Sequence, residues 1–186
     1  PQKPDLVVIS PNDPAAMERY VDECIALDVP YVYDPSQQVA RFDGPPLKHG
    51  IEKAYMLICN EYEFDLIMQK TGMSQAQITA QVPVLVITLG EQGSRIITEG
   101  TSIDIPVFPT DRIADPTGVG DAYRGGLLRG MAAGWDWQLC GQIGALCATY
   151  VLEQTGTQSH HYTPDAFIRR FRTVFDDGDR LDVLLG

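Results

Sequence analysis

The chain opens with short apolar runs that alternate with longer segments of helical spacing. The runs that predict buried strands lie at residues 5–10, 31–34, 54–60 and 84–90. The segments whose apolar residues recur every three or four positions, and which therefore predict helices, lie at 14–29, 61–72 and 73–82. Such alternation predicts βαβ units and a mainly parallel sheet with helices on both faces. In sheets of this kind, ligands bind at the carboxyl ends of the strands.

The second half of the chain predicts a hairpin followed by helices. Apolar residues around 94–108 flank a turn at Glu99 and Gly100 and predict a hairpin. If its second strand enters the same sheet, the loop at 115–121 joins the other strand ends. Helical spacing then returns at 119–134, 136–156 and 163–175. The sequence has no visible linker or internal repeat, so residues 1–186 are expected to form one α/β domain.

Composition narrows the classes of function. The chain has 186 residues and a net charge of −11, which argues against nucleic-acid binding because such surfaces need clustered Lys and Arg. No apolar run reaches transmembrane length and no signal peptide is visible, so no membrane partner is expected. The four cysteines form no CxxC pair and the three His suggest no zinc site. Reduced thiols in a cytoplasmic protein are therefore predicted.

Residues 115–126, "DPTGVGDAYRGG", place two glycines and an acid at the start of a predicted helix. Gly118 and Gly120 let the backbone approach an anion closely, and the helix N-terminus adds unpaired N–H groups. Together they predict an anion hole. Asp121 beside it could accept a proton from an attacking hydroxyl, as general bases do in phosphoryl transfer. The alternative is a Gly-rich helix start with an acid that the helix dipole favours.

Three further segments follow predicted strands. "NEYE" places Asn60 at a strand end and Glu63 three residues later, which is typical either of a capping box or of a phosphate and magnesium site. "TLGEQG" at 88–93 is either an ordinary β-turn or a nucleotide loop. "DPSQQVAR" at 34–41 is either a polar surface loop or part of a substrate site.

Taken in order, these motifs resemble those of the PfkB family, the ribokinase-like carbohydrate and nucleoside kinases. "DPTGVGD" at 115–121 is similar to the family's C-terminal signature, "NEYE" to its NxxE motif, and "TLGEQG" to its nucleotide loop. With "DPSQQVAR" and "VLEQTGTQ", the chain looks closest to the bacterial adenosine kinases of actinobacterial type. The resemblance implies a three-layer α/β/α fold and transfer of phosphoryl from ATP to a hydroxyl, with adenosine as the expected acceptor. A ribokinase- or fructokinase-like sugar kinase and a non-catalytic nucleotide-binding fragment are the alternatives.

The resemblance also implies roles for individual residues. The expected catalytic base is Asp121, beside an anion hole formed by the N–H groups of Gly118, Val119 and Gly120. The expected ATP-binding residues are Asn60, Thr88, Leu89, Gly90, Glu91, Gln92, Gly93 and Gly120. The expected substrate contacts are Gln37, Gln38, Arg41 and Asp121. Glu63 is expected to hold Mg²⁺ through water, and Asp115 lies where family members place ligands for an activating K⁺.

Family members usually have about three hundred residues, and their N-terminal half carries most substrate contacts and a β-sheet lid that often forms a dimer interface. Residues 1–186 therefore look like the C-terminal, nucleotide-binding part, with the N-terminal part and the lid missing. We expect this chain to retain the base but to have little kinase activity alone. The resemblance also implies a homodimer formed through the lid.

Overall fold

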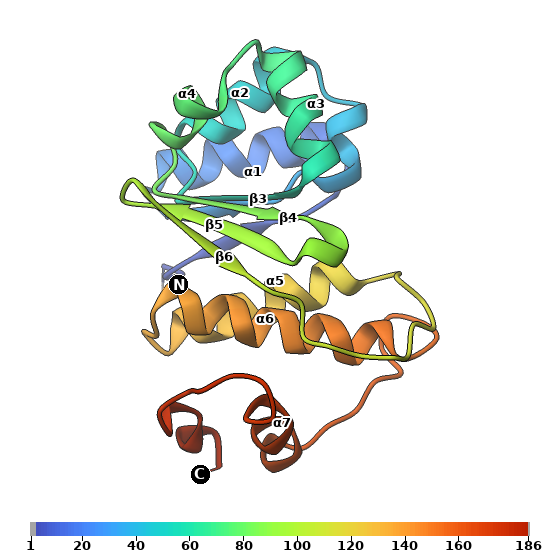
Figure 1. The fold of residues 1–186 in the computed structure, drawn as a ribbon. Helices are drawn as coiled ribbons and strands as arrows, with labels where there is room; N and C mark the ends of the chain where they lie inside the picture. The colour runs from blue at the N-terminus through green and yellow to red at the C-terminus, as the bar shows by residue number, and fades with distance from the viewer. Residues whose placement is uncertain (1–2, 186) are drawn as a thin grey trace. The chain divides into compact units, whose positions relative to one another are not determined.

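The computed structural model describes residues 3–185, and they divide into two compact units. The first unit comprises Pro1–Gly90 and Arg95–Ser102, and the second comprises Glu91–Ser94 and Ile103–Gly186. Figure 1 shows the elements of both units, each of which is described separately below.

A six-stranded sheet has its strands in the same order as the sequence, β1-β2-β3-β4-β5-β6. The strands are β1 (Val7–Ile9), β2 (Tyr31–Tyr33), β3 (Met56–Asn60), β4 (Val84–Thr88), β5 (Ser94–Thr98) and β6 (Thr101–Ile105). The first four strands pair in parallel, with Val8 opposite Val32 and Leu57 opposite Leu85. The expected parallel sheet is confirmed, and β6 belongs to the same sheet. Its end at Ile105 is three residues earlier than the apolar run suggests.

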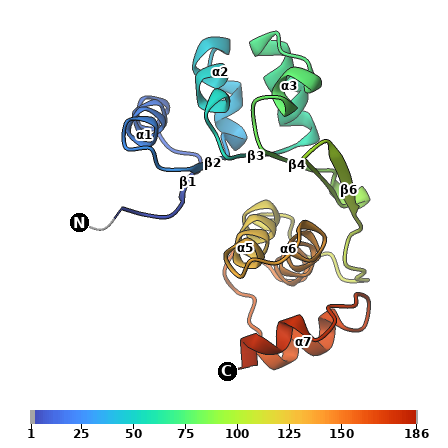
Figure 2. The ribbon, with the colours of Figure 1, turned by 90° about the vertical axis from the view of Figure 1, so that its left-hand side faces the viewer.

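Helices of the first unit cover one face of this sheet, as Figures 1 and 2 both show. These helices are α1 (Pro14–Ala26), α2 (Gly44–Glu52) and α3 (Glu61–Thr71), followed by the short α4 (Gln75–Thr79). Their apolar sides and the β-strands share one core, which includes Met17, Leu47 and Ile67 without measurable exposure. Burial of this apolar surface is the main term that stabilises the unit.

The sequence pattern missed α2. Two prolines stand in the first turn of α2, where a missing N–H is tolerated, and they disguise a helix that buries Leu47 and Ile51. The segment after β2 is partly a 3₁₀ helix, Ser36–Ala40, in which Gln38 is buried. It is therefore more ordered than a polar surface loop.

The second unit contains a closely packed helix pair, α5 (Val119–Ala132) and α6 (Trp137–Leu152). Glycines permit the close approach that the Gly-rich sequence predicts. A Cβ atom on Gly126 would lie 2.9 Å from the Cα of Gly144 and 2.8 Å from the Sγ of Cys147. Helix α7 (Pro164–Phe171) and the 3₁₀ helix Arg180–Leu185 complete the unit.

A separate apolar core joins α6 to α7. It includes Leu139 and Leu146 of α6 and Phe167 and Phe171 of α7. Helix α7 begins as predicted, with Thr163 as N-cap and Pro164 as first residue. Helix α6 ends at Leu152, four residues before the Gly156 at which the sequence suggests a stop. The chain from Glu153 to Gly156 is thereby left free to contact the glycine loop.

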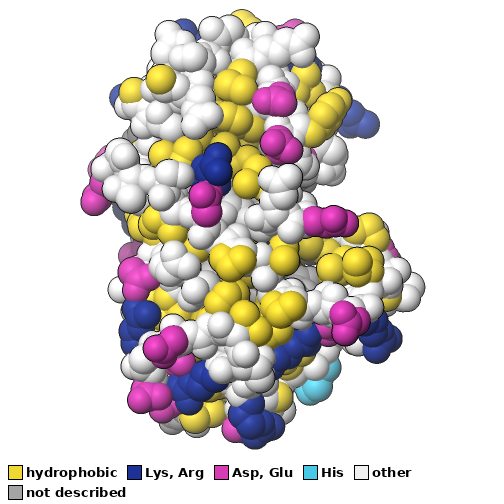
Figure 3. All heavy atoms as spheres, in the orientation of Figure 1, with side chains coloured by type: hydrophobic (Ala, Val, Ile, Leu, Met, Phe, Trp, Pro, Cys, Tyr) yellow, Lys and Arg dark blue, Asp and Glu magenta, His cyan; other side chains and the backbone are white. Residues whose placement is uncertain are grey.

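The molecular surface carries charges of both signs. On the face drawn in Figure 3, Lys and Arg side chains are interspersed with Asp and Glu side chains. Within residues 3–185, no helix has the length and apolar character needed to cross a membrane. The same residues contain no cluster of three or more His, Cys, Asp or Glu suited to holding a metal ion.

Candidate active site

The glycine loop ends at the N-terminus of α5. Gly118 is the N-cap and has a φ of 83°, in the left-handed region that favours glycine. A Cβ atom there would also lie 2.9 Å from the Cγ2 of Thr157. Two features therefore require glycine at position 118: the left-handed backbone and the close approach of Thr157.

Gly120 differs from Gly118 in both respects. Its φ is not positive, and a Cβ atom added to it would meet no atom within 4 Å. Glycine in a helix is less favourable than alanine by about 1 kcal/mol, and nothing in the packing of the described residues offsets that. Gly120 lies in the first turn of α5, where N–H groups have no partner within the helix, although the N–H of Val119 donates to the carbonyl oxygen of Pro116 at 3.3 Å. This is the arrangement expected where an anion approaches the backbone.

Asp121 lies in the first turn of α5 and is exposed. Its side chain is 71% exposed, and its Oδ1 accepts a hydrogen bond of 2.9 Å from Nη2 of Arg124. The Arg124 side chain is only 15% exposed. Asp121 thus presents a carboxylate to solvent at a helix N-terminus while an arginine one turn later fixes its orientation.

Asp115 anchors the loop to the end of α6. Its Oδ1 accepts from the N–H of Thr117 at 2.9 Å, and its Oδ2 accepts from the N–H of Gly156 at 3.0 Å. These hydrogen bonds, those from Thr117 first, lower the pKa of Asp115. The N–H groups of Ala114 and Asp115 also donate to the carbonyl oxygen of Leu152, the last residue of α6.

A cavity of about 650 Å³ opens beside this helix start, within the second unit. Gly118, Asp121 and Gly125 line it from α5, and Thr157, His160 and Tyr162 line it from the segment after α6. Tyr162 stacks on Tyr150 with ring centroids 4.4 Å apart. The Nδ1 atom of His160 is buried and has no hydrogen-bond partner among the described residues. The cavity is therefore lined by the start of α5 on one side and by Thr157, His160 and Tyr162 on the other.

In the first unit, the carboxyl ends of β3 and β4 lie side by side. Asn60 pairs in register with Thr88, so both lie at the same edge of the sheet. Asn60 also caps α3, because its Oδ1 accepts from the N–H of Glu63 at 2.8 Å. Glu63 returns a bond through Oε2 to the N–H of Asn60 at 2.9 Å. The capping-box interpretation is confirmed, and it leaves the second carboxylate oxygen of Glu63 available for a water-held cation.

The predicted nucleotide loop is divided between the units. Thr88, Leu89 and Gly90 belong to the first unit and Glu91, Gln92 and Gly93 to the second. Both glycines have positive φ, 59° at Gly90 and 90° at Gly93. A Cβ atom on Gly93 would lie 2.0 Å from the carbonyl oxygen of Ile105, so packing alone requires this glycine.

The predicted substrate contacts follow β2 in the first unit. Gln37 and Arg41 are exposed, whereas Gln38 is 9% exposed. The Oε1 atom of Gln38 is buried without a hydrogen-bond partner in the described part of the chain. An unpaired buried acceptor is unfavourable by about 1–3 kcal/mol, so this amide has unused capacity for a ligand or a water molecule.

The sequence assigned no individual role to several residues of the α5 site, although the resemblance implies that the stretch 148–161 borders the adenine pocket. Arg124 stands three residues after Asp121, a spacing at which opposite charges meet on a helix, so a signal was present. Thr157, His160 and Tyr162 reach the cavity only because the chain folds back after α6. No local pattern in the sequence predicts that the chain folds back at this point.

The comparisons with known proteins are specific. The model of the pfkB family carbohydrate kinases matches residues 2–164. The chain is 33% identical over 171 residues to a nucleoside kinase of Methanocaldococcus jannaschii, covering 89% of this chain and 55% of that protein.

Solved structures agree with this match. The nucleoside kinase of Burkholderia thailandensis in complex with inosine superposes with a TM-score of 0.91 and 35% identity, covering 94% of this chain and 59% of that one. The same enzyme has also been solved in complex with ADP-inosine. The predicted ribokinase-like α/β fold is confirmed, and this chain spans somewhat more than half the length of these relatives.

Proposed function

The chain belongs to the pfkB carbohydrate kinase family, and we propose that the protein transfers the γ-phosphoryl group of ATP to a hydroxyl group of a nucleoside. Similarity to nucleoside kinases from Methanocaldococcus jannaschii and Methanothermobacter thermautotrophicus supports a nucleoside over a free sugar. Within this class we propose adenosine as acceptor and AMP as product, on the resemblance to adenosine kinases of the actinobacterial type.

The start of α5 is the observation that carries this proposal. Gly120 has no packing partner that excludes a side chain, yet it lies in the first turn of α5 and next to an exposed carboxylate. A helix needs no glycine there, whereas an oxyanion that must touch the backbone does. Asp121 supplies a proton acceptor at the same end of the helix.

The chemistry follows from these groups. The hydroxyl oxygen of the nucleoside attacks the γ-phosphorus, the bond from that phosphorus to the β-phosphate oxygen breaks, and ADP leaves. Asp121 accepts the hydroxyl proton, and Arg124 keeps its carboxylate oriented. The N–H groups of Gly118, Val119 and Gly120 stabilise the negative charge of the transferring group through preorganised dipoles.

The first unit supplies residues for ATP and its cation. Asn60 and Thr88, paired at one sheet edge, are proposed to approach the phosphates, with Leu89 to Gly93 along the nucleotide. Glu63 fits Mg²⁺, because Mg²⁺ commonly binds one or two carboxylates, several waters and substrate phosphates. Bound there, Mg²⁺ would neutralise phosphate charge.

Asp115 is a weaker fit for K⁺. Both of its oxygens already accept backbone N–H groups, so a cation would have to share them. We propose the K⁺ role only as an addition to its role in anchoring the loop.

On the substrate side, we propose Gln37, Gln38 and Arg41 as contacts, with the unpaired Oε1 of Gln38 as the acceptor of a nucleoside hydroxyl or amine proton. A cytoplasmic location is part of the proposal, since all four cysteines are unpaired. The homodimer implied by the family resemblance can be checked by light scattering.

Substrate comparison and one substitution test the function. Turnover of adenosine, inosine, ribose and fructose with ATP separates a nucleoside kinase from a sugar kinase. A sugar kinase is the second candidate, because the family consists of carbohydrate kinases. Asp121→Asn should lower kcat by about two to four decades while ATP binding persists. Unchanged turnover would remove Asp121 from the role of base, and ATP binding without turnover of any acceptor would favour a non-catalytic nucleotide-binding protein.

A further inference from the structure

The segment that leads into the glycine loop is attached to the C-terminal end of α6 at successive points. The hydroxyl of Thr149 lies 3.2 Å from the carbonyl oxygen of Phe108 and shares its one proton between that oxygen and the carbonyl oxygen of Ala145, 3.0 Å away. The hydroxyl of Thr110 donates to Oε1 of Glu153 at 2.6 Å. Further along, Ala114 and Asp115 reach the carbonyl oxygen of Leu152. The position of the loop therefore depends on where this end of α6 lies.

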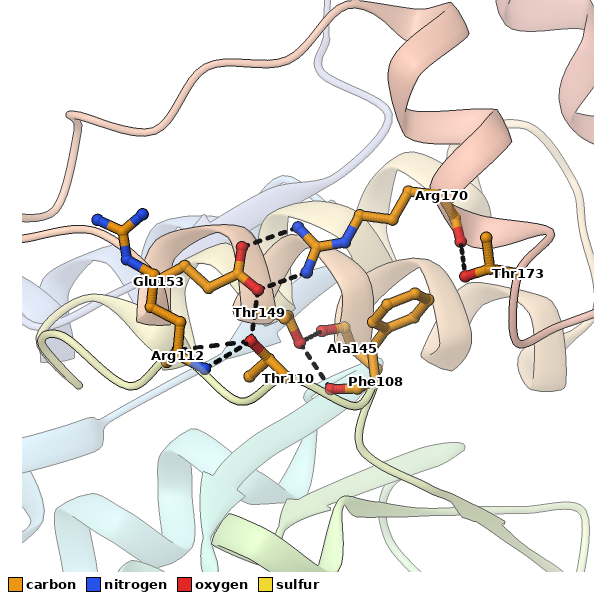
Figure 4. A network of polar contacts seen from close by, with 8 residues as sticks. All are labelled: Phe108, Thr110, Arg112, Ala145, Thr149, Glu153, Arg170 and Thr173. Carbon is orange, nitrogen blue, oxygen red and sulfur yellow. Dashed lines mark hydrogen bonds and ion pairs between the residues drawn. The ribbon is translucent and has the colours of Figure 1, made fainter.

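Glu153 is the centre of these attachments, as Figure 4 shows. It directly follows the last residue of α6 and accepts two hydrogen bonds from the guanidinium of Arg170, one of them 2.8 Å from Nη1 to Oε2. The Glu153 side chain is 15% exposed and that of Arg170 is 26% exposed. A bidentate pair with this degree of burial is more rigid than a surface ion pair.

Aromatic rings fix Arg170 from its other side. Its guanidinium carbon lies 4.5 Å from the ring centroid of Tyr150 and 5.3 Å from that of Phe108. Phe108 begins the segment that ends in the glycine loop, and Tyr150 lies in the last turn of α6. Arg170 of α7 thus contacts the segment before the glycine loop through the ring of Phe108. It contacts the end of α6 through Glu153 and the ring of Tyr150.

We propose that Glu153 and Arg170 are positioning residues for phosphoryl transfer. They act through Thr110 and the end of α6. They hold residues 110–118 so that the N–H groups of the glycine loop converge on the position of one phosphoryl group. This inference rests on the proposed function, because a phosphoryl group is what those N–H groups would receive. A small displacement of such groups lowers a rate by one to two decades while leaving distant binding contacts intact.

The matched substitutions are Thr110→Val and Thr110→Ser. Valine has nearly the shape of threonine but cannot donate to Glu153, whereas serine keeps the hydroxyl. Glu153→Gln keeps an acceptor and loses the charge. Arg169→Ala is the control, because Arg169 is the neighbouring arginine on α7 and pairs with the exposed Asp165.

Steady-state kinetics of the protein with ATP and a nucleoside give the first readout. Thr110→Val should lower kcat by about 10- to 100-fold, with the KM for the nucleoside changed less than about twofold. Thr110→Ser should keep kcat within about threefold of the wild type. The kcat of Glu153→Gln should lie between those of Thr110→Val and Thr110→Ser, and the kcat of Arg169→Ala should match the wild type. Equal kcat for the valine and serine variants would overturn the inference, as would a change confined to KM.

Amide hydrogen exchange gives a second readout that does not depend on kinase activity. Exchange at residues 114–120 should be faster in Thr110→Val than in Thr110→Ser by about tenfold, because local opening becomes easier. If the full-length wild-type protein transfers no phosphoryl group, the proposed function fails, and the exchange data alone decide whether Glu153 holds the loop. Identical exchange in both variants would overturn the positioning role in either case.

Discussion

Arg124 holds the carboxylate of Asp121 from one helical turn away, with 2.9 Å between Nη2 and Oδ1. The arginine is largely covered and the aspartate is largely exposed, so the covered partner orients the exposed one. A carboxylate at a helix N-terminus would otherwise rotate freely about its side-chain torsions. The pair therefore makes Asp121 a directed group rather than a mobile one.

Loss of this orientation should be visible in the rate. Arg124→Ala is expected to lower kcat with a nucleoside by about tenfold, because the proton acceptor must lie within hydrogen-bond reach of the hydroxyl. Arg124→Lys should retain part of the rate, since a lysine can reach the carboxylate with one donor but cannot form the planar fork.

Steady-state kinetics check this prediction, with Arg169→Ala as the control for loss of an arginine from the same unit. Thermal melts of each variant separate a rate effect from unfolding. Wild-type kcat in a folded Arg124→Ala protein would show that Asp121 needs no such partner.

The two glycines of the loop should respond differently to alanine. Gly118→Ala strains a φ of 83° and drives a Cβ atom to 2.9 Å from Thr157, so the free energy of unfolding should fall by about 1–3 kcal/mol. Gly120→Ala meets no atom within 4 Å, and its free energy of unfolding should rise by about 0.5–1 kcal/mol.

For Gly120→Ala, kinase activity should fall although stability rises. A methyl group above the first-turn N–H groups would exclude a phosphoryl oxygen, so Gly120→Ala should be stable and nearly inactive. Urea unfolding and kinase assays on the same preparation give both quantities. A Gly120→Ala protein with wild-type turnover would contradict the anion-hole role of this residue.

Local signals in the sequence predicted the frame of the site. The apolar runs located β3 and β4, and parallel pairing then placed Asn60 opposite Thr88. Asn60 followed by Glu63 predicted the start of α3, because a capping box needs only residues three apart. These features depend on neighbours in sequence or on the general geometry of parallel sheets.

Contacts between distant segments were not predictable in the same way. Gly118 meets Thr157, and Asp115 accepts from Gly156, because the chain after α6 folds back onto the loop. The sequence shows that residue 118 is glycine, but it does not show that Thr157 lies against this residue. Helix α2 was missed for a local reason, since Pro45 and Pro46 are typical breakers except in a first helical turn.

The packing of α5 on α6 gives a stability prediction with a neighbouring control. Gly126→Ala should lower the free energy of unfolding by about 1–3 kcal/mol, because its Cβ atom would lie 2.9 Å from the backbone of Gly144. Gly125→Ala meets no atom within 4 Å and should raise stability slightly through helix propensity. Chemical denaturation of the pair measures the difference. Equal midpoints would mean that the two helices can separate without loss.

The C-terminal segment should make stability depend on acid pH. Asp177 is 2% exposed as a side chain, and it accepts from Nε of Arg172 at 2.7 Å and from the N–H of Leu181 at 2.8 Å. The hydrogen bond from Arg172, more than any other contact, lowers the pKa of Asp177. A carboxyl whose pKa is lower in the folded state stabilises the fold above its unfolded pKa, near 4, and loses that contribution as the pH falls further.

Asp177→Asn should remove this contribution. We expect the free energy of unfolding at pH 7 to fall by about 1–3 kcal/mol, because an amide keeps one acceptor oxygen but loses the charge and the second acceptor. The difference between variant and wild type should shrink as the pH falls below about 4. Asp179→Asn is the control, since Asp179 is 87% exposed and lies 3.4 Å from Arg172. Urea unfolding between pH 3 and 7 measures both variants. A pH-independent difference for Asp177→Asn would show that shape, and not charge, makes Asp177 important.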